Sequence, residues 1–199
     1  MTTFLHRRAP GASLALLASL LITPAARAQT DSNAPLALPT ATVVVLPVAL
    51  YNAQANVQEA SDPSQAILST QVLTGRLREL LGPQLLAGPE IALVAASPRA
   101  RATTGNQPCN VIVACARSVA DSLNAPWVVI AKVSKTSNLI WLFTGQLIHA
   151  PTGKIVLDDS TELKGPPEGM VRAGSRIFAE RVARTVHAGG MTTNFPNTP

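Results

Sequence analysis

The feature that most constrains the fold is a run of β-branched and aliphatic residues at 41–50, which reads Ala-Thr-Val-Val-Val-Leu-Pro-Val-Ala-Leu. Such a run predicts a strand that is buried on both faces, as strands are in α/β sheets. Pro47 has no backbone N–H to donate, so strand pairing has to end or bulge there. The chain is therefore expected to build a sheet on which helices pack.

Two helices are predicted downstream of this strand. The first begins at Asp62, which can cap it, with Pro63 at a position that suits proline and Gln65 where a capping-box partner belongs. Gly82 and the proline after it end this helix. The second helix is predicted from one apolar face at helical spacing, formed by Ile112, Ala116, Val119, Ala120 and Leu123.

The remaining apolar runs predict the rest of the fold. Further strands are expected at 90–95, 127–133, 139–148 and 154–163, and a last helix at 171–188 has four inward side chains, Ile177, Phe178, Val182 and Val186. The order β-α-β-α-β-β-β-α predicts a single α/β (α+β) domain, in which helices pack on a mixed five-stranded sheet. Strand–helix–strand crossovers imply parallel pairs, and the short turns between the last strands imply an antiparallel meander.

The first 28 residues are predicted to be a secretory signal peptide. Basic residues at 6–8 precede an uncharged run at 11–22, and residues 26–28 read Ala-Arg-Ala, so cleavage is expected between Ala28 and Gln29. The apolar run is shorter than the roughly 20 residues of a membrane-spanning helix. An uncleaved membrane anchor is the alternative, but all three parts of a signal peptide are present.

The segments that flank the domain are polar and lack periodicity. Residues 29–40 contain two prolines and are expected to be a flexible lead-in, and residues 189–199 are expected to be a disordered tail. The single α/β domain is then 41–188. After cleavage, a periplasmic protein without a stable membrane anchor is predicted.

The basic charge of the chain belongs largely to the leader. The chain has 16 Lys and Arg against 11 Asp and Glu, and three of the arginines, Arg7, Arg8 and Arg27, precede the cleavage site. Hydrophobic residues make up 47% of the chain, which excludes a fully disordered protein. Aromatic residues make up only 4%, so stacking platforms for nucleic acid are scarce. No nucleic-acid partner is expected.

Cys109 and Cys115 are the only cysteines. In an oxidising compartment two cysteines indicate one disulfide, while free buried thiols and a redox or metal pair are the alternatives. On one continuous helix the two Cα atoms would lie about 9 Å apart, which is beyond the roughly 4.4–6.8 Å of a disulfide. If the bridge exists, the helix therefore has to begin near Val113.

Two resemblances follow from these patterns. The layout, with Leu46-Pro47-Val48 at the end of the first strand, resembles the amino-terminal α/β domain of the TolB type and related periplasmic domains of the curli-secretion lipoprotein and of lipoprotein activators of cell-wall synthases. These resemblances imply a domain that binds protein partners. The stretch 109–165 also resembles a family of uncharacterised bacterial secreted proteins, through both cysteines, Leu123-Asn124-Ala125, Val133-Ser134-Lys135, Ser137-Asn138-Leu139-Ile140, Thr152-Gly153-Lys154 and Leu163-Lys164-Gly165.

Candidate catalytic residues are few. His149 and His187 are the histidines of the mature chain, and either could serve a hydrolase as ligand or base, although solvated element ends are the simpler interpretation. The motif of a nucleophile elbow, a Walker A loop or a zinc protease does not occur. Asp158, Asp159 and Glu162 are interpreted as a solvated, charge-protected edge strand, because neighbouring strand residues face opposite sides. No cofactor, metal site or catalytic residue is predicted.

Two features are candidates for contact with a partner. Lys135, Arg172 and Arg176 form a candidate partner surface, since the two arginines lie one helical turn apart; Lys132 and Arg184 extend this basic patch. Along 139–148, one strand face carries Trp141 and Phe143, and the other carries Ile140 and Leu142. Both faces are apolar, which favours a doubly covered strand over an exposed face that docks a partner.

The sequence therefore favours a non-enzymatic periplasmic accessory protein that binds another envelope protein. The alternative is a small-ligand-binding module with a pocket at the carboxyl ends of the parallel strands, near the 96–108 loop. A hydrolase is the third candidate.

Overall fold

One mixed sheet organises the fold in this computed structural model, which describes residues 42–52, 59–104, 108–137 and 140–190. These residues all lie in the second of the two units of the chain, Ala37–Pro199. The described strands are β1 (Val43–Val45), β2 (Ala49–Asn52), β3 (Leu85–Leu86), β4 (Trp127–Lys135), β5 (Ile140–His149) and β6 (Lys154–Lys164). Their order is β3-β1-β4-β5-β6, and β2 pairs with β4.

Strand direction divides the sheet into two halves. β1 runs parallel to β3 and β4, and β2 runs parallel to β4. β4, β5 and β6 form the predicted antiparallel meander. The mixed α/β fold is confirmed, but the described sheet has six strands, because the first apolar run forms two strands that pair with β4 one after the other.

The interruption between β1 and β2 lies at Pro47, as its missing donor predicts. The polar backbone groups that leave the sheet here are bound by side chains instead. Asn110 Nδ2 donates to the Pro47 carbonyl at 2.7 Å, and the Val48 N–H donates to Thr70 Oγ1 at 2.9 Å. Buried backbone groups need such partners, so the irregular chain at Pro47 specifies the positions of two distant side chains.

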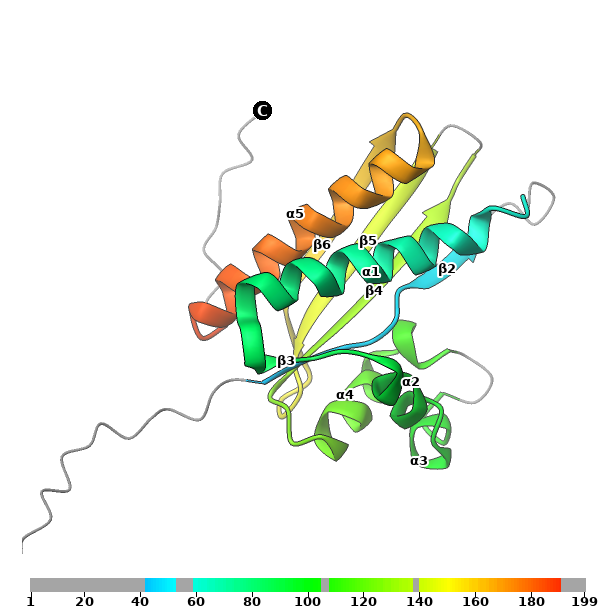
Figure 1. Cartoon of the computed structure of the whole chain (residues 1–199). Coiled ribbons are helices and arrows are strands. Elements are labelled where there is room, and N and C mark those ends of the chain that lie inside the picture. The colour runs from blue at the N-terminus through cyan, green and yellow to red at the C-terminus, as the bar shows by residue number, and fades with distance from the viewer. Residues whose placement is uncertain (1–41, 53–58, 105–107, 138–139, 191–199) are drawn as a thin grey trace, which may run out of the picture. The chain divides into compact units, whose positions relative to one another are not determined.

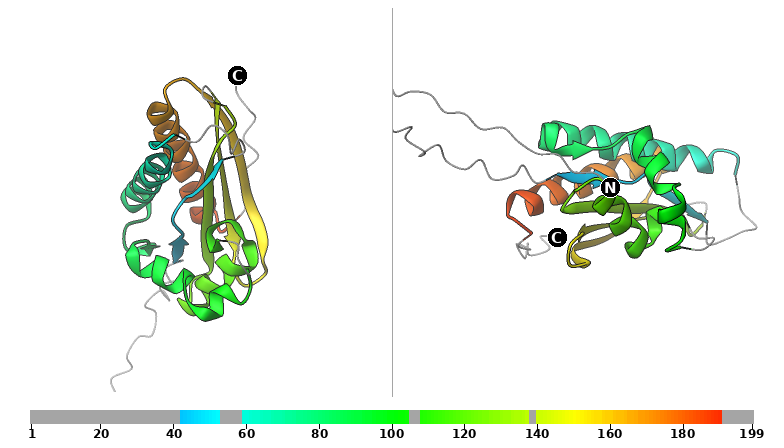
Figure 2. Two further views of the ribbon diagram at one scale, coloured as in Figure 1. Left: turned by 90° about the vertical axis from the view of Figure 1, so that its right-hand side faces the viewer. Right: turned by 90° about the horizontal axis from the view of Figure 1, so that it is seen from below.

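Helices cover the two faces of the sheet unequally (Figure 1). α1 (Asp62–Leu81) and α5 (Pro167–His187) lie along one face and enclose the larger apolar core. α2 (Pro89–Ala95), α3 (Pro98–Arg101) and α4 (Val113–Ser122) gather at one end of the other face, over a smaller core (Figure 2). Two short 3-10 helices, η1 (Gly82–Gln84) and η2 (Cys109–Val111), complete the described elements.

The strand predicted at 90–95 is wrong, because this segment is the helix α2. A short apolar run has too few residues for its period to distinguish helix from strand. Pro89 suits the first turn of a helix, and of the following residues Ile91 is buried whereas Leu93 is 74% exposed. The parallel edge strand is instead Leu85–Leu86, and the polar loop after α2 contains the short helix α3.

The helix α5 matches its predicted inner face except at one residue. Phe178, Val182 and Val186 are buried, but Ile177 is 43% exposed. The Phe178 ring lies so close to Gly145 of β5 that a Cβ at this glycine would be 2.5 Å from it. Glycine is therefore required at 145 by the approach of α5.

Candidate functional site

Strand β5 separates a covered face of the sheet from an open one. Trp141 and Phe143 are buried in the core beneath α1 and α5. Ile140 and Leu142, on the other face, are only partly buried. The prediction that both faces of this strand are covered is met only in part there, because α2, α3 and α4 gather at one end of the sheet (Figure 2). This part of β5 is therefore a partly accessible apolar face.

We call this uncovered region the open face. Its members follow from the strand register, in which Lys132 lies opposite Thr144 and Thr144 lies opposite Ser160. Tyr51 of β2 joins the region, since this residue is 57% exposed and the centre of its ring lies 5.6 Å from Lys132 Nζ. The open face comprises Tyr51, Lys132, Ile140, Leu142, Thr144, Gln146, Asp158, Ser160 and Glu162.

A hollow of about 150 Å³, which we call the sheet hollow, opens where η2 meets the open face. Its polar side chains are Asn110, Lys132, Thr144 and Gln146. The side-chain oxygen of Asn110 is buried and has no hydrogen-bond partner within the described residues. Buried polar atoms are nearly always paired, with protein or with ordered water, so this oxygen is an acceptor that the described residues leave open.

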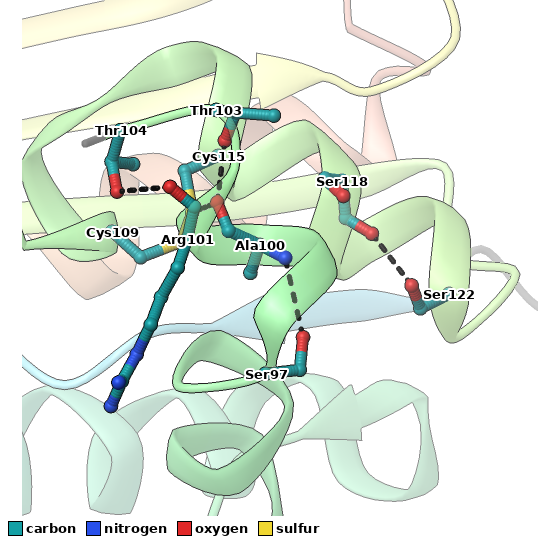
Figure 3. Close-up of a disulfide and its surroundings, with 9 residues drawn as sticks. All are labelled: Ser97, Ala100, Arg101, Thr103, Thr104, Cys109, Cys115, Ser118 and Ser122. Carbon is teal, nitrogen blue, oxygen red and sulfur yellow. Dashed lines mark hydrogen bonds between the residues drawn. A yellow bond between two sulfur atoms is a disulfide. The ribbon is translucent and has the colours of Figure 1, made fainter.

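Cys109 and Cys115 are joined by a disulfide, with their Cα atoms 5.1 Å apart (Figure 3). The helix α4 begins at Val113, as the geometry of such a bridge requires. Cys115 is fully buried, and its partner belongs to η2. The closed loop contains Asn110, so the bridge fixes this residue beside the sheet.

A second hollow lies on the other side of η2, and we call it the disulfide hollow. It has a volume of about 260 Å³, and its lining includes Pro47, Arg101, Thr104, Cys109 and Asn110. The side chain of Arg101 runs away from the disulfide (Figure 3). This is the place predicted for a ligand pocket, next to the 96–108 loop.

Lys135 does not belong to a partner surface, because it is 2% exposed at the end of β4. Its Nζ lies 3.1 Å from Asp62 Oδ1 and 3.3 Å from Glu59 Oε1. Burial alone lowers the pKa of Lys135, but hydrogen bonds to the two carboxylates outweigh it and raise the pKa above its ordinary value. Arg172 and Arg176 are exposed on α5. The predicted surface is therefore divided, and Lys132 lies on the opposite face of the sheet.

The histidines occupy different elements. His149, at the end of β5, packs on Trp127 with ring centres 4.9 Å apart, and its Nδ1 lies 2.9 Å from Thr152 Oγ1. His187 ends α5. Of the acidic residues on β6, Asp159 is buried and bound by Arg181 at 2.7 Å, so the solvated interpretation is wrong for this residue.

Two kinds of feature are absent from the described residues. They contain no group of three or more His, Cys, Asp and Glu that could hold a metal ion. No helix among them is both long enough and apolar enough to cross a membrane. The cleavage site at Ala28 and Gln29 lies outside the described residues, as do the leader, the lead-in and residues 191–199 of the tail.

Three solved structures of bacterial proteins have a similar course of the chain. The C-terminal domain of LpoB from Salmonella enterica is 13% identical, with a TM-score of 0.41, 65% of this chain covered and 87% of that one. The PelC dodecamer from Paraburkholderia phytofirmans is 13% identical, with a TM-score of 0.40 and coverage of 70% and 87%. TolB from Acinetobacter baumannii is 14% identical, with a TM-score of 0.38 and coverage of 73% and 29%.

The sequence comparisons identify a family. No curated protein matches the chain. Residues 41–181 match the family DUF3280, which is described as "Protein of unknown function (DUF2380)". The match begins with the first apolar run and continues into α5, so it spans more than half of the chain. The chain belongs to this DUF3280 family of uncharacterised proteins.

Proposed function

We propose that the protein is exported through its leader and acts in the periplasm as a non-enzymatic accessory protein that binds another envelope protein. The observation that carries this proposal is the open face, on which Ile140, Leu142 and Tyr51 present apolar surface that α2, α3 and α4 leave uncovered. Uncovered apolar side chains with a polar surround are typical of docking surfaces. The disulfide supports an oxidising compartment.

The charges of the open face indicate the chemistry of the partner. Asp158 and Glu162 lie on the same face of β6 and both are exposed, and Glu162 Oε1 lies 3.4 Å from Lys164 Nζ. A complementary surface places basic groups opposite these carboxylates and an apolar side chain against Leu142. Edge charges of this kind also disfavour pairing of β6 with a further strand. The partner therefore docks on the face of the sheet.

A photo-crosslinking side chain at Leu142 tests the docking proposal in intact cells. We expect one discrete protein adduct that disappears when an excess of the untagged protein competes. The matched control carries the same group at Ile67, an exposed aliphatic residue on α1, across the sheet from the open face. Equal adducts from both positions, or none from Leu142, would contradict docking.

Export is tested separately, by determining the first residue of the protein recovered from the envelope fraction. We expect Gln29 at the new N-terminus. A chain that begins with Met1 and stays in the cytoplasm would overturn the periplasmic location.

A small-ligand-binding module is the second candidate, and the disulfide hollow is the observation that favours it. The lining of this hollow combines apolar residues with Arg101 and Asn110, a composition found in ligand sites. Thermal unfolding in the presence of small carboxylates is the test. A stabilisation lost in Arg101→Gln but kept in Arg99→Gln supports it, and identical behaviour of both variants rejects it.

A further inference from the structure

The sheet hollow brings together polar side chains from η2, β4 and β5. No hydrogen bond or ion pair within the described part of the chain engages the side chains of Lys132, Thr144 or Gln146. Lys132 Nζ lies 5.6 Å from the centre of the Tyr51 ring. These three side chains and Asn110 line the same hollow, and the side-chain oxygen of Asn110 has no hydrogen-bond partner within the described residues.

Each polar side chain of the sheet hollow restricts the chemistry of the ligand that can bind there. The ammonium of Lys132 and the hydroxyl of Thr144 are cross-strand neighbours and both can donate, as a carboxylate requires. The oxygen of Asn110 only accepts, so the ligand has to offer an N–H or O–H there. Gln146 can do both, but Asp158 lies opposite it and repels a negative charge. The ligand carboxylate therefore belongs at Lys132.

The size of the hollow limits what enters. Its volume of about 150 Å³ suits a small group, such as one side chain or one chain end. An acidic residue and its own peptide N–H combine a carboxylate and a donor in this volume.

The acceptor is held in place before a ligand arrives. Asn110 Nδ2 is bound to the Pro47 carbonyl at 2.7 Å, which fixes the direction of the amide. The disulfide closes the loop that carries this residue. A preformed acceptor lowers the entropy cost of binding.

We propose that the sheet hollow is a recognition pocket for a peptide carboxylate and the adjacent amide N–H, with Lys132 and Thr144 binding the carboxylate and Asn110 accepting from the N–H. This inference rests on the proposed function, because it names the group of the partner that anchors it on the open face. The carboxylate belongs either to a chain end or to an Asp or Glu side chain, which share this chemistry.

Titration of the purified protein with three peptides, followed by amide NMR, tests the pocket. The probes are acetyl-Ala-Ala with a free carboxylate, the same peptide as its amide, and acetyl-Ala-Asp-Ala-amide. We expect saturable shifts at Thr144 and Gln146 with at least one carboxylate peptide. The uncharged amide should bind at least about tenfold more weakly, since charge-assisted hydrogen bonds have been lost. The carboxylate peptide that binds more tightly identifies the source.

Matched variants test whether the peptides bind in the sheet hollow. Lys132→Gln should weaken binding about tenfold or more, whereas Lys154→Gln, which removes an exposed cation at the start of β6, should leave it unchanged. Gln146→Leu should also weaken it. The inference is overturned if the amide binds as tightly, if Lys132→Gln binds normally, or if no saturable shift appears up to about 10 mM peptide.

Failure of the pocket and failure of the proposed function are distinguishable. A specific adduct at Leu142 without carboxylate binding rejects only the pocket. Carboxylate binding without an adduct rejects docking on the open face and leaves the pocket as a peptide site.

Discussion

Lys135 Nζ lies 3.1 Å from Asp62 Oδ1, which joins the last residue of β4 to the first residue of α1 across 73 positions of sequence. Both side chains are buried, Lys135 at 2% and Asp62 at 3% exposure. The other oxygen of Asp62 accepts from the Glu59 N–H at 3.0 Å. This carboxylate therefore anchors the start of α1 to the sheet, in place of the predicted capping-box pair with Gln65.

Replacing Asp62 should destabilise the domain more than replacing Glu59, the other carboxylate that contacts Lys135. Asp62→Asn keeps the size of the side chain but leaves the buried Lys135 without its closest counter-charge, which is costly. We expect a fall of several degrees in Tm. Glu59→Gln is the control, because Glu59 is 57% exposed and exposed ion pairs contribute little. Equal Tm values for Asp62→Asn and the unaltered protein would contradict this role.

The same ion pair predicts a dependence of stability on alkaline pH. The native pKa of Lys135 is raised, whereas the unfolded value is about 10.4. A raised native pKa makes a contribution that is fully present below about pH 10.4 and is lost as the pH rises through the native pKa. In urea unfolding, the advantage of the unaltered protein over Lys135→Gln should stay constant near neutral pH and shrink above about pH 10.4. An advantage that grows there would refute the assignment.

Removing the disulfide should lower the free energy of unfolding by about 2 kcal/mol, the chain-entropy value for so short a loop. The variant Cys109→Ser with Cys115→Ser is compared with the unaltered protein by chemical denaturation. A reductant should destabilise the unaltered protein and leave the double variant unchanged. A reductant effect of equal size in both would show that the bridge is not its cause.

Adding a methyl group at Gly145 should destabilise the domain by about 1–3 kcal/mol, the usual cost of overfilling a core. The Cβ of Gly145→Ala would lie 2.5 Å from the buried ring of Phe178. Gly75→Ala is the control, since a Cβ there meets nothing within 4 Å inside α1. That change should stabilise by roughly 0.5–1 kcal/mol, because alanine favours helix interiors. Denaturation midpoints measure the stability of both variants. A Gly145→Ala protein with unchanged stability would contradict the close contact with Phe178.

Substitutions at two adjacent residues of β5 should affect different properties, the stability of the domain in one case and the binding of a partner in the other. Phe143→Ala should cost about 3–5 kcal/mol of stability, because this ring is fully buried. Leu142→Ser should change stability by less than about 1 kcal/mol and reduce crosslinking to a partner. A photo-crosslinking side chain at Tyr51 measures this loss of crosslinking to a partner. A Leu142→Ser protein that is as unstable as Phe143→Ala would place Leu142 in the core.

Much of the fold could be predicted from the sequence because the patterns that specify it are local. A run of β-branched residues predicts a buried strand, and a proline without an N–H predicts its interruption at Pro47. The reach of a disulfide predicts that α4 starts near Val113. The seven residues of α2 were misassigned, since a run so short carries too little of either period.

Sequence by itself determined the class of the fold, the break at Pro47, the conditional start of α4 and the family match over 41–181. Only the tertiary structure decided which apolar and polar side chains are covered. Lys135 is buried because Asp62 packs against it. Leu142 is partly exposed because α4 packs at the other end of the sheet. Asn110 is held in place because its side chain donates a hydrogen bond to the Pro47 carbonyl. Burial and pairing depend on residues far away in the chain, which a local pattern does not specify.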